Sequence, residues 1–267
     1  MTHGGSAPAA LDAALERIAG CRRLLVALDF DGTLAPEVDD PLAARALPAA
    51  AAALDALQAL PETFVALVSG RSLESLAHVG QVAPGTPLVG SHGLEVRIGA
   101  GDPEPAVDDA DRNRVVSLRA ALAPLVDAVD GAWIEDKPAG FAVHTRVVVS
   151  EAAGALQRDV RERASALDPG LTVRDGKNVI EFAVRDATKG DGLRILRDRL
   201  GVDAVLFAGD DVTDEDALRV LGEQDLGIKV GAAATVAEHR VADPAAMAAL
   251  LAELAERRRG IVSGSTR

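Results

Sequence analysis

The sequence predicts an α/β protein, a doubly wound parallel sheet with a smaller α/β domain inserted into it, and two observations lead to this fold class. Short apolar runs, each followed by turn residues and a helical segment, recur towards both ends of the chain, which is the pattern of a parallel sheet covered by helices. Between them, after a stretch rich in Gly, Pro and Asp at 99–111, the chain changes to closely spaced strand pairs. We therefore expect a core of residues 1–100 and 185–267 and an inserted domain of residues 101–184.

The core elements follow from local patterns of apolar residues. Runs with the length of buried parallel strands occupy 24–28, 63–68, 204–209 and 226–230. Helical periodicity fits 45–60, 72–79, 190–200, 214–222 and 245–258. Asp243 and Pro244 are expected to cap and open the last of these helices. The Ser- and Gly-rich tail from Gly260 to Arg267 is expected to be disordered.

The inserted domain is predicted to be an antiparallel sheet covered on one face by two helices. Helices are expected at 112–127 and 151–167, and strands at 133–137, 141–146, 171–175 and 178–184. A turn at Pro138, Ala139 and Gly140 would join the first two strands into a hairpin. Alternation along the strands puts His144, Arg146 and Glu181 on one polar face, with apolar residues that include Val147 on the other.

Composition excludes several classes of partner. Lysine and arginine number 28 against 41 acidic residues, and the resulting net charge of −13 disfavours nucleic acid and anionic membranes. Aromatic residues are 2% of the chain and Tyr is absent, so base-stacking surfaces are not expected. The single Cys21 excludes an intrachain disulfide. Because no export signal or membrane-spanning segment is evident, we expect a soluble, cytoplasmic protein. We also expect a monomer.

The first candidate for chemistry is the run LDFDGTL at 28–34. The preceding strand would deliver Asp29 to the carboxyl edge of the parallel sheet, where open α/β folds bind ligands, with Asp31 two residues later. One carboxylate could attack phosphorus while the other, held protonated, gives its proton to the departing alkoxide. An acidic turn without function is the alternative for a bare pair of Asp residues. A calcium loop is excluded because its sixth and twelfth positions require Gly and Glu, and these are Leu34 and Asp40 here.

A second acidic group, GDDVTDED at 209–216, also follows an apolar strand. The helix macrodipole explains acids in the first turn of the next helix, such as Glu215 and Asp216. It does not explain Asp210 and Asp211, which precede the helix and place like charges side by side. Carboxylate oxygens with room for waters and a phosphate suit Mg²⁺, so we expect a magnesium site here.

Ser69 in VSGRS and Lys189 in ATKGDG lie at strand-to-helix or loop-to-helix junctions. An isolated Ser in such a place is by default a turn or cap residue. Lys189 is harder to explain in that way, because the N-terminal end of a helix disfavours a cation unless an anion lies nearby. A hydroxyl and an ammonium opposite two carboxylates would form a phosphate pocket.

The chain resembles the haloacid dehalogenase superfamily of phosphatases in four features that occur in this order: LDFDGTL, Ser69, Lys189 and GDDVTDED. The resemblance implies an aspartyl-phosphate on Asp29, with Asp31 as general acid and then as base for the hydrolytic water. It also implies that Ser69 and Lys189 hold the phosphoryl oxygens. The implied ligands of Mg²⁺ are Asp29, the Asp31 carbonyl and Asp210, and the implied supports around the metal are Asp211 and Asp214.

A closer resemblance, to trehalose 6-phosphate phosphatases, rests on VSGRS, GSHGLE at 90–95, WIEDK followed by HTR, and GKNVIE at 176–181. It covers almost the whole chain and implies hydrolysis of trehalose 6-phosphate to trehalose and phosphate, the last step of trehalose biosynthesis. The small-molecule sugar phosphate would be the partner, and the inserted domain would act as a cap that sets specificity. The implied substrate contacts are Arg71, His92, Glu135, Lys137, His144, Arg146, Lys177 and Glu181.

Other functions remain open at this point. Another sugar phosphate phosphatase or a sugar phosphate mutase would share the core motifs, because the insert decides the substrate. A phosphoryl-accepting signalling module would also use clustered aspartates, Mg²⁺, a hydroxyl and a lysine. In such a module the Asp that accepts the phosphoryl group would stand at the end of a later strand, whereas here the strand TFVALV is followed by Ser69 and offers no Asp. Such a module would also carry no large insert.

Overall fold

The computed structural model describes residues 7–38, 40–99, 108–176 and 178–264. The chain divides into two compact units, one formed by Met1–Pro103 with Thr188–Arg267 and the other by Glu104–Ala187. We call the first the core unit and the second the inserted unit. None of the helices within the described residues is both long enough and apolar enough to cross a membrane.

The core unit is built on a seven-stranded sheet with the order β11-β10-β9-β1-β2-β3-β4. All neighbouring strands are parallel except β3 and β4, which are antiparallel at one edge. The strands are β1 (Leu24–Leu28), β2 (Thr63–Val68), β3 (Leu88–Gly90), β4 (Glu95–Arg97), β9 (Ala204–Gly209), β10 (Leu226–Val230) and β11 (His239–Val241). The predicted parallel sheet is confirmed, and three short strands that the sequence analysis did not predict extend it: β3, β4 and β11.

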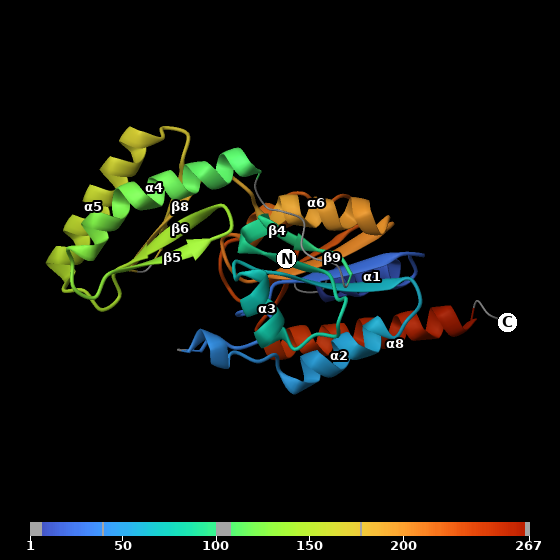
Figure 1. The fold of residues 1–267 in the computed structure, drawn as a ribbon. Helices are drawn as coiled ribbons and strands as arrows, with labels where there is room; N and C mark the ends of the chain where they lie inside the picture. The colour runs from blue at the N-terminus through green and yellow to red at the C-terminus, as the bar shows by residue number, and fades with distance from the viewer. Residues whose placement is uncertain (1–6, 39, 100–107, 177, 265–267) are drawn as a thin grey trace, which may run out of the picture. The chain divides into compact units, whose positions relative to one another are not determined.

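Helices cover both faces of this sheet, as Figure 1 shows for α2 and α8 on one side and α6 on the other. In β1, Leu24, Val26 and Leu28 belong to one buried cluster together with residues of α1, α2, α3 and α8. Leu25 and Ala27 belong to a second buried cluster with residues of α6 and α7. Because side chains alternate along a strand, a continuous apolar run is what a strand buried on both faces requires.

Five helices of the core unit differ from their predicted ranges mainly at their ends, and α1 is not among the predicted helices. They are α1 (Ala7–Ala19), α2 (Pro48–Gln58), α3 (Leu73–Gly80), α6 (Lys189–Leu200), α7 (Asp214–Leu218) and α8 (Pro244–Gly264), with short 3-10 turns η1 (Pro41–Ala43) and η2 (Ser91–Gly93). Asp243 caps α8 as predicted, since its Oδ1 accepts from the N–H of Ala246 at 2.8 Å. The prediction of a disordered tail is wrong for residues 260–264, which continue α8, and residues 265–267 lie outside the described part of the chain.

The inserted unit is an antiparallel sheet with the order β5-β6-β8-β7 and two helices, as predicted. Its elements are α4 (Asp109–Asp127), β5 (Trp133–Lys137), β6 (Gly140–His144), α5 (Ser150–Leu167), β7 (Thr172–Gly176) and β8 (Val179–Ala183). Phe141 and Phe182 pair across β6 and β8, with ring centroids 5.4 Å apart, and both are buried. Figure 1 shows α4 and α5 on one side of these strands.

The predicted strand at 141–146 ends early, at His144. Arg146 and Val147 lie in the turn that follows, where Val147 is 73% exposed instead of packing on the apolar face. The alternation argument that put Arg146 beside His144 is therefore wrong. Thr145 and the three valines at 147–149 are β-branched and resemble a continuing strand, but the backbone turns there: the N–H of Val148 donates to the carbonyl of Thr145 at 3.1 Å.

One buried cation ties the C-terminal helix to the amino ends of the central strands. Arg258 on α8 is 1% exposed. Its guanidinium donates to the Thr63 hydroxyl at 2.6 Å and to four backbone carbonyls at 2.6 to 3.0 Å, those of Ala19, Cys21, Arg22 and Glu62. No other side chain could satisfy these acceptors together, because only the guanidinium fork offers five donors.

We predict that Arg258→Met lowers the free energy of unfolding of the core unit by about 2–5 kcal/mol, since it leaves buried carbonyls without donors. Urea and thermal unfolding followed by circular dichroism measure the change. Arg259→Met is the matched control: Arg259 is the next residue, is exposed and pairs with Glu256, so its change should stay within about 0.5 kcal/mol. Equal losses in both variants would contradict this account of Arg258.

Candidate active site

The candidate site lies at the carboxyl edge of the core sheet, where three neighbouring strands end together. β9, β1 and β2 are parallel and adjacent, so the residues that follow them meet at one edge. Asp210 follows β9, Asp29 follows β1 and Ser69 follows β2. This is the edge at which doubly wound α/β folds bind their ligands.

Lys189 joins two acids at this edge. It is the first residue of α6, behind the Thr188 cap, and it is 3% exposed. Its ammonium donates to Asp29 Oδ1 at 2.8 Å and to Asp214 Oδ1 at 2.7 Å, and both carboxylates are buried. The anion that the sequence analysis expected beside Lys189 is thus supplied within the protein by these carboxylates.

The buried charges shift one another's titration. Burial is the main cause that raises the pKa of the Asp29 carboxyl to about 8, with the nearby Asp214 and Asp210 carboxylates adding to it and Lys189 opposing it. Burial alone would lower the pKa of Lys189, but the Asp29 and Asp214 carboxylates outweigh it and raise that pKa above its ordinary value. Lys189 therefore stays an ammonium, and the acids around it, which outnumber it, resist ionising together until a further positive charge lies beside them.

Three carboxylates form a group that could hold a metal ion. One oxygen each of Asp29, Asp210 and Asp214 lie within 4.8 Å of one another. Burial, followed by the charge of Asp214, raises the pKa of Asp210. Hard oxygen donors with an unbalanced negative charge fit a divalent cation. Asp214, which the resemblance gave only a supporting place, contributes to this group, whereas Asp211 is not part of it within the described residues.

Gly32 is required for the approach of Asp210. Its φ of 74° is in the left-handed region, and a Cβ at this position would lie 2.1 Å from Asp210 Oδ2. Thr33 adds a hydrogen bond from its hydroxyl to Asp210 Oδ1 at 3.3 Å. The Gly-Thr pair after Asp31 therefore admits and orients the acid from the neighbouring strand.

Asp31 forms a two-point ion pair with Arg71 that the sequence did not reveal. Arg71 Nε donates to Asp31 Oδ2 at 2.5 Å, and its terminal nitrogen donates to Oδ1 at 2.6 Å. The Arg71 backbone N–H in turn donates to Ser69 Oγ at 3.2 Å. Arg71, predicted as a substrate contact, is thus committed to Asp31 in this structure, and it orients that carboxylate.

The GSHGLE motif supports the loop that carries Ser69 and Arg71. The N–H of His92 donates to the carbonyl of Ser69 at 3.1 Å, and the N–H of Ser91 donates to that of Arg71 at 2.7 Å. Glu95 Oε2 accepts from the Ser91 hydroxyl at 2.7 Å. Ser91 and His92 both have positive φ, 49° and 57°, which is uncommon for residues with a side chain. The sequence analysis missed Glu95, and the short motif gave no signal for its contacts.

The polar face of the inserted sheet gathers several of the other predicted residues. Glu135 accepts from Lys137 and from His144, each at 2.7 Å. Although burial opposes it, these two partners lower the pKa of Glu135. Cross-strand register places Glu135, Ala142 and Glu181 in one row. Glu135, Lys137, His144 and Glu181 thus share one face.

Three further residues of the inserted unit bear on the predicted sugar contacts: Trp133, Arg146 and Lys177. Trp133, which the sequence analysis did not select, stacks on His144 with ring centroids 4.6 Å apart and planes 5° apart. Arg146 is exposed in the turn after β6. Lys177 lies outside the described residues.

The family model described as Trehalose-phosphatase matches residues 27–264. The chain belongs to the trehalose-phosphatase family. A trehalose-phosphate phosphatase of Mycobacterium marinum is 35% identical over 248 residues, which are 87% of this chain and 62% of that protein. The chain thus spans less than two thirds of the length of this relative.

Solved structures agree with this family and its fold. A trehalose-6-phosphate phosphatase of Aspergillus fumigatus superposes with a TM-score of 0.67 at 25% identity, covering 92% of this chain and 97% of that one. A haloacid dehalogenase-like hydrolase of B. subtilis superposes with a TM-score of 0.58 at 16% identity, over 85% of this chain and 98% of that one. The predicted haloacid dehalogenase-like fold is confirmed, and the second similarity concerns the fold alone.

In this trehalose-phosphatase family member, the cation between the two buried acids is open to a direct test. We predict that Lys189→Met lowers the free energy of unfolding by about 3–5 kcal/mol, because Asp29 and Asp214 then lie buried without their counter-ion. Thermal and urea unfolding measure the loss. Arg194→Met, on the exposed face of the same helix, breaks only the ion pair with Asp191 and should change stability by less than about 0.5 kcal/mol. A Lys189→Met variant as stable as the wild type would overturn this view of the cluster.

Proposed function

We propose that this chain hydrolyses trehalose 6-phosphate to trehalose and phosphate by way of a phosphoryl group carried on Asp29. The observation that carries the proposal is the group of Asp29, Lys189, Asp210 and Asp214 at the carboxyl edge, in a chain whose family match covers residues 27–264. The name of the mycobacterial relative, trehalose-phosphate phosphatase, supports the substrate.

In the first half-reaction, an Asp29 oxygen attacks phosphorus and the bond from phosphorus to the sugar oxygen breaks. Asp31 gives its proton to the departing sugar oxygen, so that neutral trehalose leaves. In the second, water attacks the phosphoryl group, Asp31 accepts the proton of that water, and phosphate leaves with Asp29 restored. The Ser69 hydroxyl and the Lys189 ammonium hold phosphoryl oxygens through both steps.

The proposed cofactor is Mg²⁺, held by Asp29, Asp210 and the Asp31 carbonyl, with Asp214 and Asp211 close by. The fit rests on the three carboxylate oxygens within 4.8 Å of one another and on the raised pKa of Asp29 and Asp210. When bound, the ion supplies positive charge to the phosphoryl oxygens and to the carboxylates that surround them.

Arg71 sets a condition on the role of Asp31. Both oxygens of Asp31 accept hydrogen bonds from the guanidinium, so neither is free to face the sugar oxygen in this arrangement. Donation of a proton therefore requires that one oxygen leave Arg71 and turn towards the sugar oxygen. The same pairing stabilises the carboxylate after the proton has been given away.

The sugar contacts are proposed on the polar face of the inserted sheet, where Glu135, Lys137, His144 and Glu181 gather. Carboxylates, an ammonium and an imidazole pair well with sugar hydroxyls, and a site built of such partners rejects analogues that lack them. Trp133, which stacks on His144, adds an apolar surface of the kind sugar rings pack on. Arg146 and Lys177 stay predictions from the family resemblance.

We predict that Asp29→Asn lowers phosphate release from trehalose 6-phosphate by at least about 1,000-fold, because the amide cannot act as nucleophile. Circular dichroism and thermal unfolding would show that the fold is retained. Activity of the wild type should also be lost on chelation of divalent ions and return with Mg²⁺. Near-normal turnover of Asp29→Asn would refute the nucleophile, and equal turnover of glucose 6-phosphate or mannose 6-phosphate would refute the substrate.

The inserted sheet provides a matched pair for testing specificity. Glu135→Gln should lower kcat/KM for trehalose 6-phosphate by about 10- to 100-fold, since Lys137 and His144 lose their carboxylate. Hydrolysis of p-nitrophenyl phosphate, which has no sugar, should stay near wild type. Asp136→Asn is the control, because Asp136 is the next residue of β5 and pairs instead with Arg119 of α4 at 2.6 Å. Equal losses on both substrates for Glu135→Gln would contradict a sugar-specific role.

A further inference from the structure

The chain uses lysine sparingly, and one of its lysines has no place in the chemistry described so far. Only four of the 28 basic residues are lysines: Lys137, Lys177, Lys189 and Lys229. The first three already belong to the proposed active site or to the predicted sugar contacts. Lys229 lies in β10 and is 1% exposed.

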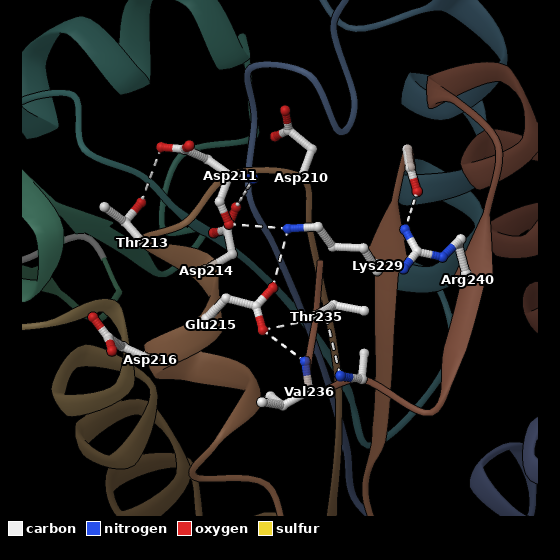
Figure 2. Close-up of polar contacts among 12 residues, drawn as sticks. Asp210, Asp211, Thr213, Asp214, Glu215, Asp216, Lys229, Thr235, Val236 and Arg240 are labelled. Atoms are coloured by element: carbon white, nitrogen blue, oxygen red, sulfur yellow. Dashed lines mark hydrogen bonds and ion pairs between the residues drawn. The ribbon is translucent and has the colours of Figure 1, made fainter. Parts of the chain in front are cut away.

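The ammonium of Lys229 reaches the loop that carries the acids of the site. It donates to the backbone carbonyl of Asp211 at 3.1 Å and to Glu215 Oε1 at 3.1 Å. Register explains the reach, because Lys229 lies opposite Gly209, the last residue of β9 before that loop. Figure 2 shows Lys229 extending towards Glu215 and the loop.

Glu215 is itself held from the other side. Its second oxygen accepts from the N–H of Val236 at 2.8 Å and from the Thr235 hydroxyl at 3.2 Å, and the residue is 6% exposed. Figure 2 shows both donors converging on this carboxylate. Lys229 is therefore anchored by a carboxylate that cannot move without losing two other hydrogen bonds.

The peptide groups on both sides of Asp211 are fixed as a result. Its carbonyl accepts from Lys229, and its N–H donates to Asp214 Oδ2 at 2.9 Å. Asp214 is held in turn by Lys189. Asp210, one residue earlier, depends on the same backbone for the direction of its carboxylate.

A purely structural role explains these contacts poorly. Removing a lysine and a glutamate from water costs several kcal/mol for each ion, and apolar residues of similar size often stabilise a core as well or better. The pair is also found where acids crowd together, at 210–216, so the loop would otherwise relax to separate its charges. A long ammonium that ends on a backbone carbonyl opposes that relaxation.

We propose that Lys229, anchored by Glu215, is a positioning residue for the metal group: it fixes the turn at Asp210 and Asp211 so that Asp210 and Asp214 present their oxygens together with Asp29. The inference rests on the proposed function only through its Mg²⁺ site. It concerns metal affinity and not the identity of the sugar phosphate.

The test is a calorimetric titration of the full chain with MgCl₂ in the absence of substrate, together with thermal unfolding with and without the ion. Lys229→Met should raise the Kd for Mg²⁺ by about 10- to 100-fold, the range found when groups that orient metal ligands are removed. Glu215→Gln should raise it less, since the ammonium keeps the Asp211 carbonyl. Arg240→Met is the matched control, because Arg240 is an exposed cation that donates to the Gly231 carbonyl and not to the acidic loop.

Each outcome decides. A lower Tm with an unchanged Kd for Mg²⁺ in Lys229→Met would show a structural pair only and overturn the proposal. If Lys229→Met does not fold, Glu215→Gln decides in its place: a Kd raised by about threefold or more supports positioning, and an unchanged Kd overturns it. If Lys229→Met weakens Mg²⁺ binding but the chain does not hydrolyse trehalose 6-phosphate, the role of Lys229 is supported and the proposed function is refuted. If the wild type releases phosphate without measurable Mg²⁺ binding, the proposed hydrolysis is supported and the role of Lys229 is overturned.

Discussion

The ammonium of Lys189 between the Asp29 and Asp214 carboxylates is the contact on which the rest of the core unit's site depends. Three acids from two distant parts of the chain converge at one edge, where Asp29 and Asp214 are buried and Asp210 is half-buried, so water screens their charges poorly. Without a counter-charge such an edge would be among the least stable places in the protein. A lysine at the first position of α6 supplies that charge and leaves an excess of negative charge, which is the condition for attracting a further cation.

The parallel sheet is what makes this convergence possible. Adjacent parallel strands end at the same edge, so residues far apart in sequence become neighbours without any local motif joining them. The continuous apolar runs of β1, β2 and β9 are buried on both faces and hold that edge rigid. The reactive groups thus lie on loops, but loops anchored at both ends by the most buried strands of the fold.

These runs also explain how much of the fold could be predicted from sequence. β1, β2, β9 and β10 match their predicted ranges because burial on both faces leaves an unbroken apolar signal. β3, β4 and β11 have three residues each, too few to show any period. The predicted strand that reaches Arg146 is wrong because the sequence signal there is misleading: the β-branched residues resemble a strand, but the backbone turns.

For the candidate site, sequence reasoning selected residues that follow strands and missed those whose importance lies in distant partners. Asp29, Ser69, Lys189 and Asp210 are predicted because each stands where an acid, hydroxyl or lysine needs explaining. Asp214 has a lesser place in the prediction because the family resemblance implies only a supporting role for it around the metal. Arg71 with Asp31, Glu95 with Ser91, and Lys229 with Glu215 are 40, 4 and 14 residues apart, and in none of them does local pattern indicate the partner.

The Arg71–Asp31 pair connects two motifs that look independent in the sequence. In the proposed reaction Asp31 alternates between acid and base, which requires a carboxylate that is neither freely mobile nor permanently bound, and its contact with the Arg71 guanidinium bears on that requirement. Arg71 is placed by the Ser69 loop, and that loop is held from behind by the backbone of Ser91 and His92. GSHGLE therefore supports the loop that carries Arg71, and the sugar contact expected at His92 stays a prediction. Its strained backbone has a function in that role, because only the left-handed turn directs both N–H groups at the Ser69 loop.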